Sequence, residues 1–223
     1  MILTPIPSDR LATTLDRFAA RLDEPAARDA FARIRATSAE RAAGAVAAEH
    51  RRQALAIARN CGMAVHAAGT QCRFNWDGVA LDGDTEAYVI LHEVAHFVLA
   101  PPERRRLVDF GLGPGPDTRD RAAAEKAVAL PLEQREADEA AASLLGILWE
   151  TALGQPALAS FLDQNWLEGL DRSAAPHFTA VLRRLSQLEL VIPATAGIHL
   201  SVREFSTGVP AGIYPRAGQW PDP

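Results

Sequence analysis

The sequence predicts a mostly helical α+β fold with a small β-sheet next to a metal-bearing helix. Alanine- and arginine-rich stretches with high helix propensity cover much of the chain. They are interrupted at residues 63–84 by short β-prone pieces with Asp-Gly pairs, which are signals for turns between strands. An apolar stretch with two histidines follows at residues 85–99, and Pro101-Pro102 ends it.

The chain of 223 residues, 48% of them hydrophobic, suits a single domain. Within residues 1–223 we expect an N-terminal helical region, a metal-binding core and a C-terminal extension, at residues 1–62, 63–192 and 193–223. The N-terminal region contains one long helical stretch, for which Gly44 and Gly62 are the expected weak point and stop. Further helices are expected at residues 131–154 and across residues 156–191, and a strand-like piece, GIHLSVREF, lies in the extension.

The composition excludes several classes of protein. A net charge of −5 argues against nucleic-acid binding, which selects strongly basic surfaces. The N-terminus lacks the features of a secretory signal, and no uncharged run approaches the ~20 residues of a membrane span. We therefore expect a cytoplasmic protein that does not contact membranes. Cys61 and Cys72 are expected to be free thiols, because a chain with a sufficient core needs no disulfide framework.

A metal-binding pattern lies in the segment YVILHEVAHFVLA, residues 88–100. His92 and His96 are separated by one helical turn, so both imidazoles reach one side of the helix and can bind the same divalent ion. Glu93 follows the first histidine, which completes a His-Glu-x-x-His motif in which the glutamate can accept a proton from metal-bound water. Two hydrogen-bonded structural histidines are the alternative interpretation.

A third protein ligand is expected from the acidic helix LPLEQREADEAAASLL. A helical wheel places Glu133 nearest the apolar face, Glu136 further from it and Glu139 opposite to it. Glu133 is therefore the preferred third ligand and Glu136 the alternative. The segment from Glu136 onward also resembles the Glu-Ala-Asp segment of gluzincin-type metallopeptidases, although Gln134 stands where those families have the ligand glutamate.

The residues after the motif extend the pattern in a more specific way. The sequence has His-Glu-Val-Ala-His-Phe, then three arginines, Asp109-Phe110-Gly111, Pro116-Asp117 and Arg119, and further on NWLEGLD. In this order, over about residues 85–185, the chain resembles the elongation factor P hydroxylase family. It departs from that family at Leu112–Gly115, where the family has Tyr-Trp-Tyr, and at Thr118, where it has glycine.

The resemblance implies a non-haem Fe(II)- and O₂-dependent hydroxylase that acts on a modified lysine of a protein such as elongation factor P, or on a related amine. Two histidines and one carboxylate would then occupy one face of the iron. Glu93 would support the ligands from beside them or carry a proton. Asp109 would accept the distal N–H of one imidazole, or instead cap a turn. We expect the other residues that support the site or contact the substrate to be Arg105, Asp117 and Arg119.

Two alternatives remain open from the sequence. One is a zinc metallopeptidase, in which Zn(II) replaces Fe(II) and Glu93 is the general base. The other is a helical binding protein with a structural metal site and no catalytic activity.

Overall fold

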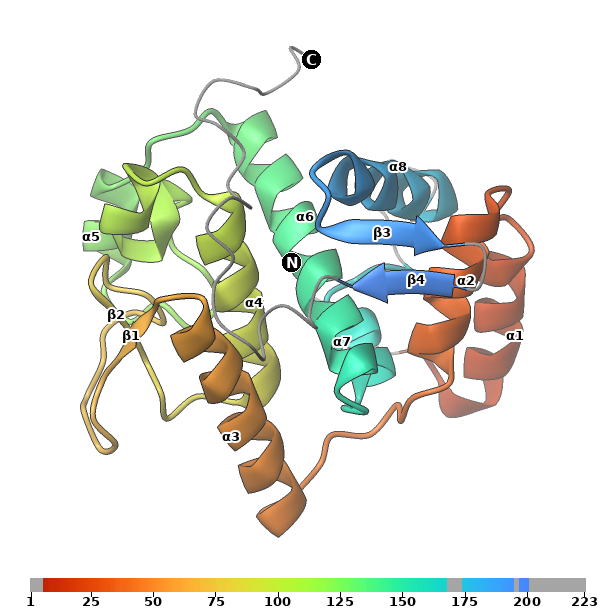
Figure 1. Ribbon diagram of the computed structural model, residues 1–223, viewed down its shortest axis with the longest axis horizontal. Helices are drawn as coiled ribbons and strands as arrows, with labels where there is room; N and C mark the ends of the chain where they lie inside the picture. The colour runs from red at the N-terminus through yellow and green to blue at the C-terminus, as the bar shows by residue number, and fades with distance from the viewer. Residues whose placement is uncertain (1–5, 168–173, 195–196, 201–223) are drawn as a thin grey trace.

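A computed structural model describes residues 6–167, 174–194 and 197–200 of the chain (Figure 1). Helices dominate it, and they are α1 (Ser8–Ala19), α2 (Pro25–Arg35), α3 (Gly44–Asn60), α4 (Ala87–Leu99), α5 (Arg121–Lys126), α6 (Leu132–Ala152), α7 (Ala157–Asp163) and α8 (Ala174–Gln187). The strands are short and form two pairs, β1 (Ala64–Val65) with β2 (Ala80–Leu81), and β3 (Val191–Ala194) with β4 (Gly197–Leu200). The expected mostly helical α+β fold is confirmed.

The helices α4 and α6 lie side by side at the centre of the molecule (Figure 1). They run antiparallel, because Gly146 of α6 lies against the backbone of His92, whereas Asp138, earlier in α6, pairs with Arg104 beyond the end of α4. Helix α3 packs on α4 through its buried residues, which include Ala54 and Ile57. The apolar sequence of α4 thus forms a helix that is covered by neighbours on more than one side.

The small sheet precedes α4 in the chain and contacts it. The strands β1 and β2 pair in parallel, with Ala64 opposite Ala80. The Asp77-Gly78 pair forms a turn in which the Asp77 carboxylate accepts hydrogen bonds from two backbone N–H groups, and Gly78 has a φ of +89°. Trp76, just before this turn, packs against Phe97 of α4 with ring centroids 5.4 Å apart. The sheet therefore lies next to the helix that carries the two histidines.

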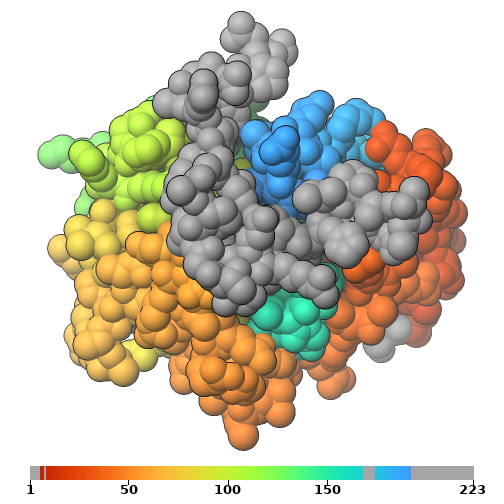
Figure 2. Space-filling view, in the orientation of Figure 1, coloured from red at the N-terminus to blue at the C-terminus, as the bar shows by residue number. Residues whose placement is uncertain are grey.

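A second cluster of aromatic side chains joins the N-terminal helices to the C-terminal part of the fold. In Figure 1, α1 and α2 lie beside α8 and the β3–β4 pair, on the opposite side of α6 from α4. Figure 2 shows the same division on the surface, with α3 (orange) on one side and the N-terminal helices (red) with α8 (blue) on the other. The rings that pack between these elements are those of Phe18, Phe31, Phe161 and Phe178.

The long helical stretch expected near the N-terminus is divided into α2 and α3 by residues 36–43. This break is explained by contacts with α7: the backbone N–H of Leu158 donates to Thr37 Oγ1, and that of Ala159 to the carbonyl oxygen of Ser38. Gly44, the expected weak point, begins α3 with a φ of +58°. The strand expected in GIHLSVREF is present as β4 over its first four residues, and residues 201–205 lie outside the described part of the chain.

The two cysteines are free thiols, as expected. Among the described helices, none combines the length and the apolar character that crossing a membrane requires.

Candidate metal centre

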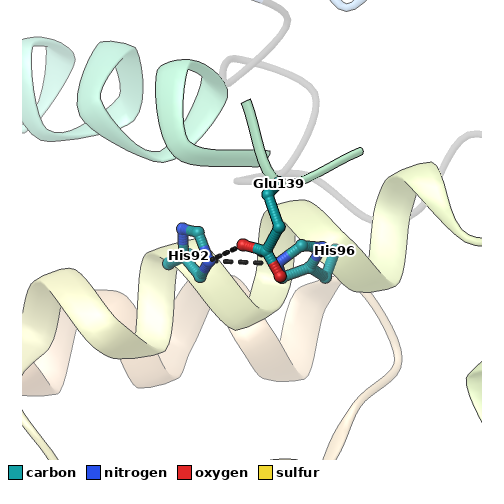
Figure 3. A group of neighbouring side chains, drawn as sticks. All are labelled: His92, His96 and Glu139. Atoms are coloured by element: carbon teal, nitrogen blue, oxygen red, sulfur yellow. Dashed lines mark hydrogen bonds and ion pairs between the residues drawn. The ribbon is translucent and has the colours of Figure 1, made fainter. Parts of the chain in front are cut away.

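Helix α4 brings the two histidines of the motif together. The Nε2 atoms of His92 and His96 are 3.0 Å apart, and the rings are nearly perpendicular, with an interplanar angle of 87° (Figure 3). The side chain of His96 is 5% exposed and that of His92 is 21% exposed. The two nitrogen atoms thus point to one place at the edge of the core, as the spacing of one helical turn predicts.

The carboxylate that meets the two imidazoles belongs to Glu139 of α6. Its Oε2 atom lies 3.4 Å from Nε2 of His92 and 3.4 Å from Nε2 of His96 (Figure 3). In the described part of the chain, these three residues form the one group of His, Cys, Asp or Glu side chains close enough to share an ion. Two imidazole nitrogens and one carboxylate oxygen are a donor set that binds divalent metals.

The spacing of the three donor atoms fits a shared ion. Ligand atoms ~2.1 Å from one metal are roughly 3.0–3.4 Å apart when the angle between them is about 90–110°. The separations of 3.0 Å and 3.4 Å fall in this range. The side chain of Glu139 is 51% exposed and that of His92 is 21% exposed, so the three residues lie near the surface of the fold.

Electrostatics keep Glu139 ionised. Burial of the carboxyl group opposes ionisation, but the charge of His96 and hydrogen bonds with His92 and His96 hold the pKa of Glu139 well below its usual range. For His96, burial disfavours the imidazolium form, yet the charge of Glu139 and a hydrogen bond with it raise the pKa. The carboxylate is therefore a negatively charged ligand, as a divalent cation requires.

The structure places the third carboxylate differently from the sequence-based expectation. Glu133 and Glu136 are exposed on the first turns of α6, and Glu139, which the helical wheel placed opposite the apolar face, lies at the imidazoles. The wheel assumed that α6 has one buried face, whereas its residues 141–150 are buried all around the helix.

A glycine marks the face of α6 that meets α4. A Cβ atom on Gly146 would lie 3.3 Å from the backbone nitrogen of His92. Glu139 precedes Gly146 by seven residues, or about two turns, and so lies on the same face. A lone glycine inside an apolar helix is therefore the sequence signal that identifies Glu139.

Glu93 is buried beside the histidines and is not in the three-residue group. Its side chain accepts a long hydrogen bond of 3.4 Å from Nδ2 of Asn75, in the segment between the strands of the small sheet. Burial raises the pKa of Glu93, although the charges of His96 and His92 act in the opposite direction. Glu93 can therefore hold a proton more readily than an exposed glutamate.

Phe110 forms the wall behind His96. Its ring stacks on the His96 imidazole, with centroids 5.5 Å apart, and also on Trp76 at 5.5 Å. Asp109 and Phe110 have φ angles of +44° and +53°, a left-handed conformation that non-glycine residues rarely adopt. This strained turn directs a fully buried ring against a candidate ligand.

The carboxylate of Asp109 is bound by a residue of the loop that follows it. The carboxylate accepts a hydrogen bond of 2.8 Å from the Thr118 hydroxyl, whose oxygen accepts the backbone N–H of Gly115. Burial raises the pKa of Asp109, against the hydrogen bond from Thr118. Asp109 thus stabilises the loop that follows it. Asp109 was expected to accept a hydrogen bond from the distal ring nitrogen of an imidazole. For His92 that atom is Nδ1, which is buried without a hydrogen-bond partner in the described part of the chain.

The remaining predicted residues follow α4 in the chain, Arg105 in a 3₁₀ helix and Asp117 and Arg119 in a later loop. Arg105 donates from Nε to the carbonyl oxygen of Ala100 at 2.9 Å, and its guanidinium lies over the ring of Phe97. It thus stabilises the C-terminal end of α4, where carbonyl groups lack helical partners. Asp117 and Arg119 are exposed in the following loop, and Arg119 donates to the carbonyl oxygen of Cys72. Contact of these residues with a substrate stays a prediction.

The fold and the site together define a mostly helical α+β protein with a candidate divalent metal centre formed by His92, His96 and Glu139. Residues 86–138 match the family model of elongation factor P hydroxylase, which confirms the expected resemblance to this family over this segment. The matched segment includes both histidines, Glu93 and Asp109, and it ends one residue before Glu139. Among curated proteins and solved structures, none matches this chain.

Proposed function

We propose that this protein is a non-haem Fe(II)- and O₂-dependent hydroxylase, with His92, His96 and Glu139 as the iron ligands. The observation that carries this proposal is the convergence of three donor atoms at 3.0–3.4 Å, two of them within the segment that matches the hydroxylase family. Two imidazoles and one carboxylate on one face of Fe(II) leave positions free for O₂ and substrate.

The residues around the ligands have separate roles in this proposal. Bound iron would supply the activation of O₂. Phe110 holds the His96 ring in place, and the buried Glu93 holds or transfers a proton near the ligands. The side chains of Glu139 and His92 are 51% and 21% exposed, so the three residues lie near the surface, where another protein can approach. The proposed substrate is a modified lysine on a protein such as elongation factor P, or a related amine.

Metal analysis after anaerobic purification, combined with O₂ consumption, tests the proposal. We expect about one iron per chain and its oxidation on exposure to air. With an added two-electron reductant, which reduces the second oxygen atom of O₂ to water, we expect O₂ uptake that depends on an amine-bearing substrate. His96→Ala should lose the iron. A wild-type protein that retains zinc tightly and does not react with O₂ would refute the hydroxylase assignment.

The burial of Glu93 beside both histidines favours a second candidate, a zinc metallopeptidase. In that reaction Glu93 is the general base for water, and Zn(II) polarises the scissile carbonyl. Glu93→Gln would then abolish hydrolysis while the metal stays bound. If the wild-type protein cleaves no peptide in a mixture of varied sequences, the peptidase proposal fails.

A further inference from the structure

The first turns of α6, which carry Glu139, have little apolar contact with the rest of the fold. From Leu132 to Ala140 the buried side chain is that of Asp138, and Leu132 itself is 62% exposed. The continuously buried part of α6 begins at Ala141. The hydrophobic core therefore does not by itself fix the position of the Glu139 carboxylate.

Asp138 is held by two arginines from different parts of the chain. Its Oδ2 atom accepts from Nη2 of Arg104 at 2.5 Å, and its Oδ1 atom accepts from Nη2 of Arg184 at 3.1 Å. Arg104 lies in the short 3₁₀ helix η1 (Arg104–Arg106) after α4, and Arg184 lies in α8. Asp138 and Arg104 are 5% and 7% exposed, so both charges are removed from water. Loss of either partner would leave a buried charge unpaired, which is energetically costly.

This arrangement connects the end of α4 to the beginning of α6. Gly146 brings the two helices into close contact at His92, two turns further along α6. Glu139 lies between this contact and the Asp138 ion pairs. Because Asp138 and Glu139 are adjacent in a helix, their side chains point about 100° apart, and Asp138 does not compete for the imidazoles.

We infer that Asp138, held by Arg104 and Arg184, is a positioning residue that places Glu139 over the two imidazoles and so sets the metal affinity of the centre. This inference rests on the proposed metal centre. The ion pairs fix both the rotation of the first turns of α6 and their offset along α4. A loss of either would let the Glu139 carboxylate move away from the point at which the two Nε2 atoms converge.

Cobalt(II) titration of the full-length protein tests the inference, because bound Co(II) reports its ligand geometry through visible absorption. We expect Asp138→Asn to weaken Co(II) binding at least tenfold and to change the shape of the visible bands. Arg184→Gln, at a partly exposed partner, should produce a smaller change in the same direction. Asp16→Asn removes a surface ion pair with Arg35 and serves as the control, with wild-type affinity and spectrum.

The readouts separate positioning from general stability. Each variant is titrated well below its unfolding temperature, with circular dichroism as a check of folding. A folded Asp138→Asn protein with a wild-type Co(II) spectrum and an affinity within about twofold of wild type would overturn the inference. If Asp138→Asn does not fold, the Co(II) spectrum and the Co(II) affinity of Arg184→Gln are compared with wild type instead, and wild-type values for both would overturn the inference. A wild-type protein that binds no Co(II) would instead refute the proposed metal centre itself.

Discussion

Gly146 of α6 lies against the backbone of His92, so that a Cβ atom at this position would be 3.3 Å from the His92 nitrogen and 3.4 Å from its Cα. These distances are tighter than ordinary van der Waals contacts, and the contacted atoms belong to the backbone of a buried helix. The absence of a side chain at residue 146 therefore determines how closely α6, and with it Glu139, approaches the histidines.

Substitution of Gly146 is expected to weaken metal binding more than it weakens folding. Alanine favours a helix over glycine by up to about 1 kcal/mol, which offsets the cost of moving α4 by a few tenths of an ångström. We expect Gly146→Ala to change the free energy of unfolding by less than about 1 kcal/mol, and to lower Co(II) affinity several-fold. Gly146→Val should cost about 1–3 kcal/mol, because it overpacks the contact. Denaturant unfolding and metal titration measure both quantities, and unchanged affinity in a folded Gly146→Val protein would contradict this account.

The third ligand is distinguished by a matched pair of substitutions on the same helix. Glu139→Gln removes the charge that faces both imidazoles, and we expect a loss of metal affinity of at least 100-fold with little change in folding. Glu133→Gln changes an exposed glutamate six residues earlier on the same helix and should bind metal like the wild type. Equal affinity of the two variants, measured by chelator competition, would remove Glu139 from the ligand set.

Phe110 is expected to affect both stability and the metal centre. Replacement of this fully buried ring by leucine should cost about 1–2 kcal/mol of unfolding free energy, because the smaller side chain fits the site less well. Phe31→Leu, at an equally buried position in the aromatic cluster beyond α6, should cost a similar amount. Only Phe110→Leu should also lower Co(II) affinity, since Phe110 stacks on His96. If both variants lower the Co(II) affinity to the same extent, the stacking of Phe110 on His96 does not support the ligand.

The buried side chain of Glu150 is expected to make the stability of the protein depend on pH, independently of the metal centre. It is 2% exposed near the end of α6, and burial raises its pKa from 4.5 to about 7, against a hydrogen bond from Ser160 and the charge of Arg41. Between these two pH values the unfolded chain loses the proton while the folded protein keeps it. The free energy of unfolding therefore falls as the pH rises from about 4.5 to 7, and this contribution is constant above pH 7.

Glu150→Gln removes that titration. Relative to wild type, the variant should gain about 2–3 kcal/mol of unfolding free energy between pH 4.5 and pH 8. Urea unfolding across this range measures the difference, and Glu133→Gln, exposed on the same helix, provides the control with a wild-type slope. Parallel curves for wild type and Glu150→Gln would exclude a raised pKa at this position.

The parts of the fold that depend on neighbours in the sequence could be predicted without the structure. The apolar residues of α4, its stop at Pro101-Pro102 and the turn at Asp77-Gly78 all appear where the local pattern indicates. The break between α2 and α3 was harder to place. It depends on hydrogen bonds from the backbone of α7 to Thr37 and Ser38, more than 100 residues away in the chain.

The sequence by itself determined the pair of histidines, because a spacing of four residues in an α-helix places two side chains one turn apart whatever surrounds them. Only the tertiary structure decided which carboxylate completes the group. That choice depends on how α6 is rotated and offset against α4. The close contact at Gly146 and the pairing of Asp138 with Arg104 fix this rotation and offset. A helical wheel drawn for α6 alone contains no information about either contact. Glu139 therefore meets the imidazoles because of packing between two helices, and not because of its place on the apolar face of one.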